Sequence, residues 1–207
     1  MPPMPEHLIT DFAALEALFG PVAQPSIAKE SDRLHPVYAR WIGQARFALL
    51  ATSGPDGVDV SPRGDAGPLV RIADDRTLLL PERRGNNRID SLRNLLADPR
   101  MGLIFLIPGV GETLRVRGRA QIDADPALLA SFAVDGKPPQ CVLRVAVDKV
   151  FFQCARSILR SRLWHPDEHD TAGVPTPGAM LAALTEGGMD GEAYDSALPE
   201  RQRATLY

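Results

Sequence analysis

The stretch Leu78 to Leu96, LLLPERRGNNRIDSLRNLL, decides the predicted fold. Its apolar start predicts a buried strand, which we expect Pro81 to end because proline has no N–H to donate to a neighbouring strand. A loop follows with three arginines, Arg83, Arg84 and Arg88. Apolar residues then recur at helical spacing, namely Ile89, Leu92, Leu95 and Leu96. The stretch therefore predicts a strand, a basic loop and the first turn of a helix.

This basic loop has two interpretations. Free backbone N–H groups and the helix dipole favour an anion at a helix N-terminus, and arginine forks can hold a phosphate in bidentate fashion. In this interpretation the loop holds the phosphate of a bound cofactor. Alternatively, the loop is a solvated basic segment in which Asn86 or Asn87 caps the helix. The stretch alone leaves both interpretations open.

The composition limits the class of protein. The chain has 207 residues, of which 44% are hydrophobic, and no apolar run approaches a membrane span. The first ten residues, MPPMPEHLIT, lack the pattern of a signal peptide, so we expect a cytoplasmic protein without a membrane partner. The net charge of −3 and the pI of about 5.8 argue against a nucleic-acid partner. Arginine clusters on such a protein favour a small anionic ligand.

The cysteine and histidine residues do not predict a metal site. Cys141 and Cys154 both lie in apolar, strand-like runs and are expected to be buried free thiols. His165 and His169 flank Pro-Asp-Glu, but their spacing does not support zinc, and a solvated loop is the favoured interpretation.

The order of elements predicts an antiparallel β-structure. Turn signals at residues 55–57 and 108–111 are too short for crossover helices, which disfavours a doubly wound sheet. We expect a mainly β fold with peripheral helices, an α+β arrangement around a small barrel. The expected strands cover residues 47–52, 58–60, 69–72, 77–80, 101–107, 113–122, 142–147 and 150–153, and the expected helices cover residues 8–19, 35–43, 125–132 and 178–185.

Three segments are expected along the chain. Residues 1–44 contain helices that pack on the barrel, residues 45–166 form the barrel domain, and residues 167–207 form a C-terminal helical extension or tail.

With its expected elements in this order, the sequence from about Phe47 to Trp164 resembles the pyridoxamine 5′-phosphate oxidase-like, FMN-binding split-barrel proteins. The best-matched part is RTLLLPERRGNNRIDSLRNLLADPRMGLIFL followed by TLRVRGRAQI. The resemblance implies a split β-barrel with FMN as cofactor. It also implies a homodimer with the cofactor at the interface, which agrees with two basic clusters meeting at one dianion.

The resemblance implies a role for each matched position. Arg83, Arg84, Arg88, Asn86 and Asn87 would hold the FMN phosphate, while Leu80, Pro81 and Glu82 would run beside the ribityl chain and isoalloxazine. The residues that would meet the ring edge are Ser61, Arg63, Gly64 and Asp65. The partner chain would contribute Arg156, Ser157, Arg160, Arg162 and Trp164.

Some of these residues have alternative roles. Arg63 and Asp65 could pair with each other across a turn, although Gly64 allows close backbone approach and favours a site role. Trp164 could equally fill a dimer interface. Arg115, Arg117 and Arg119 share one face of a strand that either lines the site or is exposed.

The chain departs from the oxidase itself. The oxidase has a C-terminal Arg-Leu-His-Asp-Arg-type signature, whereas Arg162-Leu163 continues here to Trp164-His165-Pro166. We therefore expect an uncharacterised branch of the family. No residue stands out as a general acid or base, so any chemistry would belong to the cofactor.

Two functions follow as hypotheses. The first is an FMN-dependent oxidoreductase that passes hydride or electrons between a reduced nicotinamide or a small organic substrate and an acceptor. The alternative is a non-catalytic binding or carrier protein for flavin, haem or the deazaflavin F420.

Overall fold

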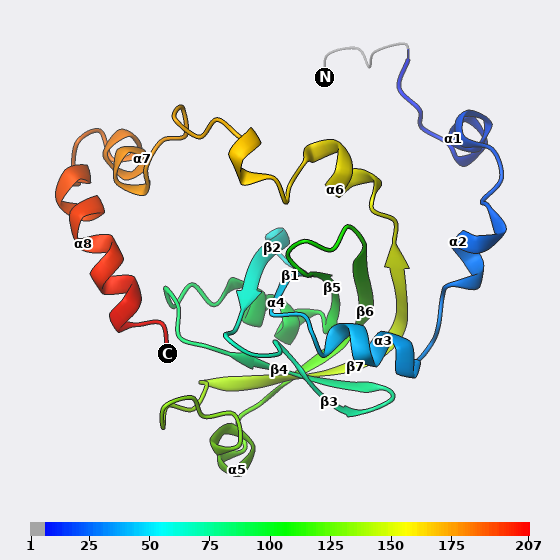
Figure 1. Cartoon of the computed structure of the whole chain (residues 1–207), viewed down its shortest axis with the longest axis horizontal. Helices are drawn as coiled ribbons and strands as arrows, with labels where there is room; N and C mark the ends of the chain where they lie inside the picture. Colours follow the sequence, from blue (N-terminus) through cyan, green and yellow to red (C-terminus); the bar gives the residue numbers. More distant parts are fainter. Residues whose placement is uncertain (1–6) are drawn as a thin grey trace. The chain divides into compact units, whose positions relative to one another are not determined.

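A seven-stranded antiparallel sheet forms the main unit of the protein, in the order β2-β1-β5-β6-β7-β4-β3 (Figure 1). The computed structural model describes residues 7–207, so part of the segment used to exclude a signal peptide lies outside the described residues. The strands are β1 (Phe47–Gly54), β2 (Gly57–Gly64), β3 (Arg71–Asp74), β4 (Thr77–Glu82), β5 (Arg100–Leu106), β6 (Thr113–Asp123) and β7 (Cys141–Gln153).

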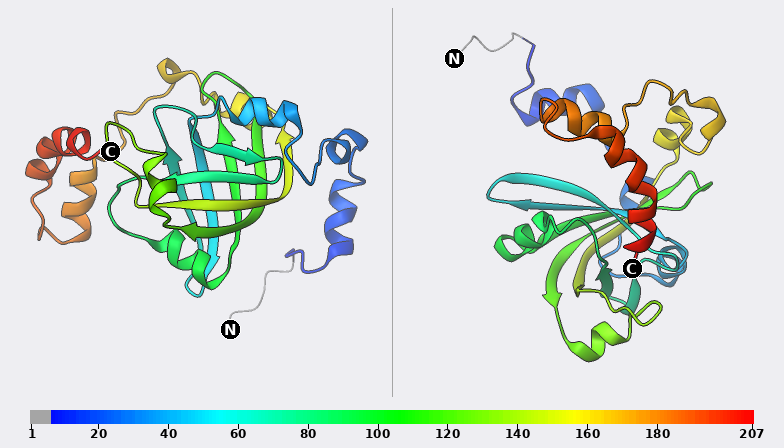
Figure 2. Two further views of the ribbon diagram at one scale, coloured as in Figure 1. Left: turned by 90° about the horizontal axis from the view of Figure 1, so that it is seen from below. Right: turned by 90° about the vertical axis from the view of Figure 1, so that its left-hand side faces the viewer.

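The sheet curls into a barrel that stays open between its two end strands, β2 and β3 (Figure 2). Every strand pair is antiparallel. Short turns join β1 to β2 and β5 to β6 at the predicted positions. The predicted fold class, a mainly β split barrel with peripheral helices, is therefore confirmed.

The core lies inside the curled sheet, because strand residues alternate between its two faces. In β6 the buried positions include Leu114, Val116 and Ala120, and the arginines between them are exposed. Leu50 of β1, Phe105 of β5 and Leu143 of β7 are fully buried in the same cluster. The basic face of β6 therefore points away from the core.

Two helices contact the core cluster. Helix α3 (Pro36–Ile42) buries Ile42 completely and places Tyr38 and Trp41 against the cluster. Helix α4 (Asp90–Ala97) buries Leu95 and packs against β1. The contact of α4 with β1 is close: a Cβ atom on Gly54 would lie 2.0 Å from Oδ1 of Asn94.

The structure corrects several sequence predictions. Pro81 does not end its strand, because β4 continues to Glu82 and Pro81 pairs in register with Val142 of β7. The N–H that proline lacks would face the β3 side, where the pairing of β3 with β4 stops at Leu79. The two strands predicted from residue 142 to 153 are one strand, β7. Cys141 is buried as predicted, but Cys154, just past the end of β7, is exposed.

The chain after β7 is helical. It contains α6 (Arg156–Ser161), the 3-10 helix η1 (Pro166–Glu168), α7 (Pro177–Leu184) and α8 (Gly191–Ala204), and the short helix α5 (Pro126–Ala130) precedes β7. Helices α7 and α8 pack on each other through Gly178, whose N–H donates to Oδ1 of Asp195 at 2.7 Å. The predicted helix at residues 178–185 is thus confirmed within one residue.

The described residues up to Glu30 belong to a separate unit. In its described part, α1 (Phe12–Phe19) begins where the carboxylate of Asp11 accepts a hydrogen bond from the N–H of Ala14, and α2 (Gln24–Ala28) follows. None of the α1 residues is buried.

Candidate functional site

Strand β2 presents three polar side chains on one face. The alternation of the strand places Asp59, Ser61 and Arg63 on the partly buried face, while Val58 and Val60 face solvent. Ser61 and Arg63 were predicted as site residues from the sequence. Asp59 was missed, although its spacing of two from Ser61 already indicated the same face.

The end of β4 meets this face through a buried ion pair. Nε of Arg63 donates to Oε1 of Glu82 at 2.8 Å, and the two side chains are only 17% and 12% exposed. Nη1 of Arg63 also donates to Oγ of Ser61 at 2.9 Å. Arg63 therefore pairs with Glu82 and not with Asp65, the partner considered from the sequence.

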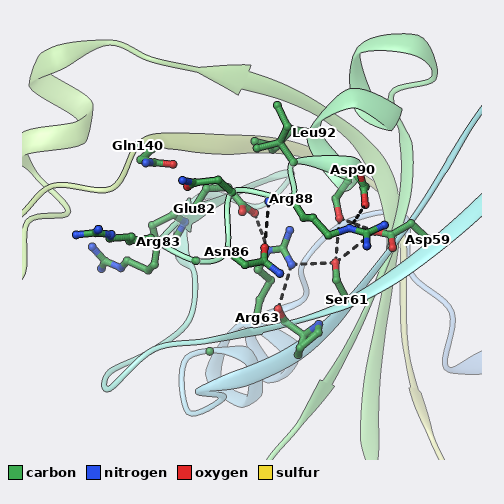
Figure 3. A pocket seen from close by; sticks show the side chains of 18 residues that line it. Asp59, Ser61, Arg63, Glu82, Arg83, Asn86, Arg88, Asp90, Leu92 and Gln140 are labelled. Atoms are coloured by element: carbon green, nitrogen blue, oxygen red, sulfur yellow. Dashed lines mark hydrogen bonds and ion pairs between the residues drawn. The ribbon is translucent and has the colours of Figure 1, made fainter. Parts of the chain in front are cut away.

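A hydroxyl network extends from Arg63 to helix α4. Oγ of Ser61 lies 2.9 Å from Oγ of Ser91, and Ser91 donates to Oδ2 of Asp59 at 2.7 Å. Ser91 is buried in the first turn of α4. This network fixes the start of α4 against the polar face of β2 (Figure 3).

The loop between β4 and α4 carries the three predicted arginines in three different states. Arg83 is engaged: Nε and Nη2 donate to Oδ2 of Asp65 at 2.9 and 2.8 Å, and Nη1 donates to the carbonyl of Phe132 at 2.8 Å. Arg84 is exposed and has no ion-pair partner in the described chain. Arg88 is 79% exposed and donates through Nε to Oδ2 of Asp90 at 2.8 Å.

Helix α4 starts later than it would if Asn86 or Asn87 were its N-cap, as one interpretation of the sequence predicted. The N-cap of α4 is Ile89, which makes no side-chain cap hydrogen bond. Asn87 has a left-handed φ of 59°, and Oδ1 of Asn86 accepts from the N–H of Arg88 at 3.0 Å. The asparagines therefore shape the loop before the helix and do not cap it.

These elements enclose a cavity of about 560 Å³. That volume lies within the range of about 300–1,000 Å³ that is usual for cofactor and ligand pockets. The arginines Arg63, Arg83, Arg84 and Arg88 and the carboxylates Asp59, Glu82 and Asp90 line it. Arg88 and Asp90 lie toward one end of the cavity, and Arg83 and Gln140 toward the other (Figure 3).

The surroundings of two groups near the cavity, Arg88 and Cys141, determine their protonation states. The hydrogen bond that Arg88 donates to the Asp90 carboxylate raises the pKa of Arg88, so its guanidinium stays charged. Burial, with a smaller contribution from the charge of Glu82, raises the pKa of the neighbouring Cys141 thiol to about 11. That thiol is consequently neutral near pH 7 and is a poor nucleophile.

Ten of the residues predicted from the sequence line this cavity: Ser61, Arg63, Gly64, Pro81, Glu82, Arg83, Arg84, Asn86, Asn87 and Arg88. Asp65 does not line it but holds Arg83. Leu80 is fully buried in the core. Gln140 was not predicted from the sequence; it reaches the cavity because its backbone N–H donates to the carbonyl of Glu82.

The predicted residues near α6 lie elsewhere in the chain and do not line the cavity: Arg156, Ser157, Arg160, Arg162 and Trp164. Arg156 and Arg160 are exposed, and Arg162 pairs with Glu168. Nε1 of Trp164 donates to the carbonyl of Val110 at 2.7 Å. Arg115, Arg117 and Arg119 are exposed on β6 and also stay outside the cavity.

Within residues 7–207, no group of three or more His, Cys, Asp or Glu side chains is arranged to hold a metal ion. None of the helices in the described part of the chain combines the length and the apolar character that crossing a bilayer requires.

One family model and several solved structures match the chain. The family model described as pyridoxamine 5′-phosphate oxidase matches residues 34–154 of the chain. Among solved structures, HupZ from Group A Streptococcus is 21% identical over 53% of this chain and 86% of its own, with a TM-score of 0.41. General stress protein 26 from Bacillus anthracis str. Sterne is 17% identical over 55% of this chain and 88% of its own, with a TM-score of 0.41.

A third solved structure covers more of the chain. An FMN-binding protein from Syntrophomonas wolfei subsp. wolfei is 15% identical over 68% of this chain and 91% of its own, with a TM-score of 0.41. No curated protein matches the sequence.

Proposed function

The chain belongs to the pyridoxamine 5′-phosphate oxidase family, and from this membership we propose that it is a cytoplasmic, FMN-dependent oxidoreductase. One observation carries the proposal: the cavity of about 560 Å³ ends on a basic loop at the start of α4. Arg84 in that loop has no anionic partner in the described chain, and Arg88 has only Asp90. Such a loop suits the phosphate end of a cofactor.

Different residues at the cavity would hold different parts of FMN. Arg84 and Arg88, with Asn86 and Asn87, would hold the phosphate, because their polar groups lie in one loop at the cavity. Arg83 is better suited to form the wall, since its donors are already bound to Asp65 and Phe132.

The floor of the cavity would support the ribityl chain and the isoalloxazine ring of FMN. Ser61 and Arg63 lie on the β2 face, and Pro81 and Glu82 come from the end of β4. The Arg63–Glu82 pair holds this floor in place. It would keep Arg63 oriented toward polar groups at the ring edge. When bound, FMN would supply the redox chemistry by accepting hydride or electrons from a reduced nicotinamide or a small organic substrate.

Among the described residues, every carboxylate that lines the cavity already has a partner, so none is free for acid–base chemistry. Asp59 accepts from Ser91, Glu82 pairs with Arg63, and Asp90 pairs with Arg88. The role of the chain is therefore to bind, orient and shield the cofactor.

Cofactor uptake tests the proposal directly. The purified protein should be yellow, or should become yellow after incubation with FMN and removal of the excess. Mass spectrometry of the released ligand would then distinguish FMN from F420 or haem. A colourless protein that takes up no FMN would contradict the proposal.

A homodimer is part of this proposal. The exposed basic residues of α6 do not line the cavity of their own chain, and in this proposal they complete the partner's site. Arg88→Ala and Arg160→Ala should each weaken FMN binding, and a mixture of the two variants should regain intact sites by exchange of subunits. A monomer in sedimentation, or no recovery on mixing, would count against the shared site.

A carrier function is the second candidate. The absence of a free acid or base among the described cavity residues favours it over an oxidoreductase with protein-based proton transfer. Stopped-flow mixing of the FMN-bound protein with NADH and with NADPH separates the two functions. An oxidoreductase should turn over with one of the reductants, or with another small donor, and a carrier should not.

A further inference from the structure

The segment that follows helix α8 reaches the end of β2 through Tyr207. The hydroxyl of Tyr207 donates to Oδ1 of Asp65 at 2.8 Å and accepts from the N–H of Ala66 at 3.0 Å. Asp65 directly follows β2, and Tyr207 lies 142 residues further along the chain. These hydrogen bonds therefore fix the C-terminal segment beside the strand that carries Ser61 and Arg63.

Asp65 in turn holds the first arginine of the loop between β4 and α4. Its Oδ2 accepts from Nε and Nη2 of Arg83 at 2.9 and 2.8 Å, whereas its Oδ1 accepts from Tyr207. The side chains of Asp65 and Arg83 are only 6% and 14% exposed. Nη1 of Arg83 donates to the carbonyl of Phe132 at 2.8 Å. All three nitrogens of this guanidinium thus have a partner, and the direction of the side chain is fixed.

The ring of Tyr207 lies next to the same ion pair. The guanidinium carbon of Arg83 is 5.4 Å from the ring centroid, which is within the reach of a cation–π interaction. Tyr207 also borders a smaller cavity of about 230 Å³ together with Arg83 and Arg84. An ion pair beside an aromatic ring interacts more strongly than one in water, because the local dielectric constant is lower. Loss of Tyr207 should therefore weaken the hold of Asp65 on Arg83.

We propose that Tyr207 is a positioning residue of the cofactor site, which acts through Asp65 on Arg83 and thereby holds the start of the loop between β4 and α4 in its binding conformation. The inference rests on the proposed function, because the same loop would bind the FMN phosphate. Arg84 directly follows Arg83, and Arg88 lines the cavity further along the loop. A loop that is already fixed at its start loses less conformational freedom when the phosphate binds, which increases the affinity.

Hydrogen–deuterium exchange of the FMN-free protein tests the first half of this inference. Tyr207→Phe removes only the hydroxyl, and Tyr207→Ala also removes the ring. Tyr194→Phe is the matched control, because Tyr194 contacts Arg201 within α8 and lines neither cavity. We expect the amides of residues 83–89 to exchange faster in Tyr207→Phe, faster still in Tyr207→Ala, and at the wild-type rate in Tyr194→Phe. The amides of β7 serve as the internal reference for the intact barrel. Equal exchange of the loop in the wild type and Tyr207→Ala would overturn the inference.

Titration with FMN and with riboflavin tests the second half. We expect Tyr207→Phe to bind FMN about threefold to tenfold more weakly than the wild type, without a matching loss for riboflavin, because the loop would act on the phosphate. In an Arg83→Met background, Tyr207→Phe should cause no further loss, since its effect passes through Arg83.

An additive loss in the double variant, or an equal loss for FMN and riboflavin, would overturn the positioning role. Failure of the wild type to take up FMN would instead refute the proposed function. The exchange measurement would still decide whether Tyr207 holds the loop, so the two failures are distinguishable.

Discussion

Nε of Arg63 lies 2.8 Å from Oε1 of Glu82, and this pair joins β2 to the end of β4 beneath the larger cavity. Both side chains are largely buried, and β2 and β4 are not neighbours in the sheet. The ion pair therefore connects two parts of the barrel that no backbone ladder joins directly.

Arg63→Ala should destabilise the protein by about 3 kcal/mol, because it leaves the carboxylate of Glu82 buried without its partner. Denaturant unfolding measures the loss. The double variant Arg63→Met with Glu82→Leu should recover most of the stability, since it removes both charges. A single variant as stable as the wild type would show that the pair contributes little.

Gly118→Ala should destabilise the barrel. A Cβ atom there would lie 2.2 Å from the carbonyl oxygen of Ala146, at the irregular register between β6 and β7. Overpacking of this kind costs about 1–3 kcal/mol. Thermal unfolding of Gly118→Ala and of Gly102→Ala makes the comparison, because a Cβ atom at Gly102 meets only ordinary contacts of 3.9 Å or more. Equal stabilities would contradict the close approach.

The two thiols should react very differently. Cys154 is exposed, whereas Cys141 is buried and burial raises the pKa of its thiol to about 11. A thiol reagent at neutral pH should therefore label one cysteine rapidly and the other only on unfolding. Cys154→Ser should abolish the rapid phase. Rapid labelling of that variant would show that Cys141 is accessible.

The hydrogen bond that the Tyr207 hydroxyl donates to Asp65 should persist in mild alkali and be lost in strong alkali. Burial, together with the hydrogen bond to Asp65, raises the pKa of the Tyr207 phenol above its ordinary value of 10.0. The stability that this contact contributes is thus fully present below pH 10.0 and is lost as the pH rises through the folded-state pKa. The difference in phenolate absorbance between the wild type and Tyr207→Phe isolates this titration. A midpoint at or below pH 10.0 would refute the contact.

The sequence predicted the strands well because their signals are local. The turn signals lie directly between paired strands, and the alternation of β6 is visible in its own residues. Ser61 and Arg63 were predicted through the family resemblance, and both line the cavity. Pro81 misled the prediction of where β4 ends. Proline is tolerated there because the pairing of β3 with β4 has already stopped, and no residue near Pro81 indicates where that pairing stops.

The missed site residues depend on contacts between distant parts of the chain. Ser91 lies 30 residues from Ser61, and Tyr207 lies 142 residues from Asp65. A serine in a helical segment and a tyrosine in a charged tail have no pattern that indicates such partners. Likewise, the engagement of Arg83 by Asp65 follows from the folded loop and could not be separated from the roles of Arg84 and Arg88 in the sequence.

The most direct test of the central claim is a fluorescence titration of the wild type and Arg88→Ala with FMN and with riboflavin, which lacks the phosphate. Arg93→Ala is the matched control, because Arg93 also lies near Asp90 but does not line the cavity. We predict that the wild type prefers FMN and that Arg88→Ala weakens FMN binding about tenfold to a hundredfold without a matching loss for riboflavin. Equal binding of FMN and riboflavin by the wild type, or unchanged FMN affinity in Arg88→Ala, would contradict a phosphate site in the loop between β4 and α4.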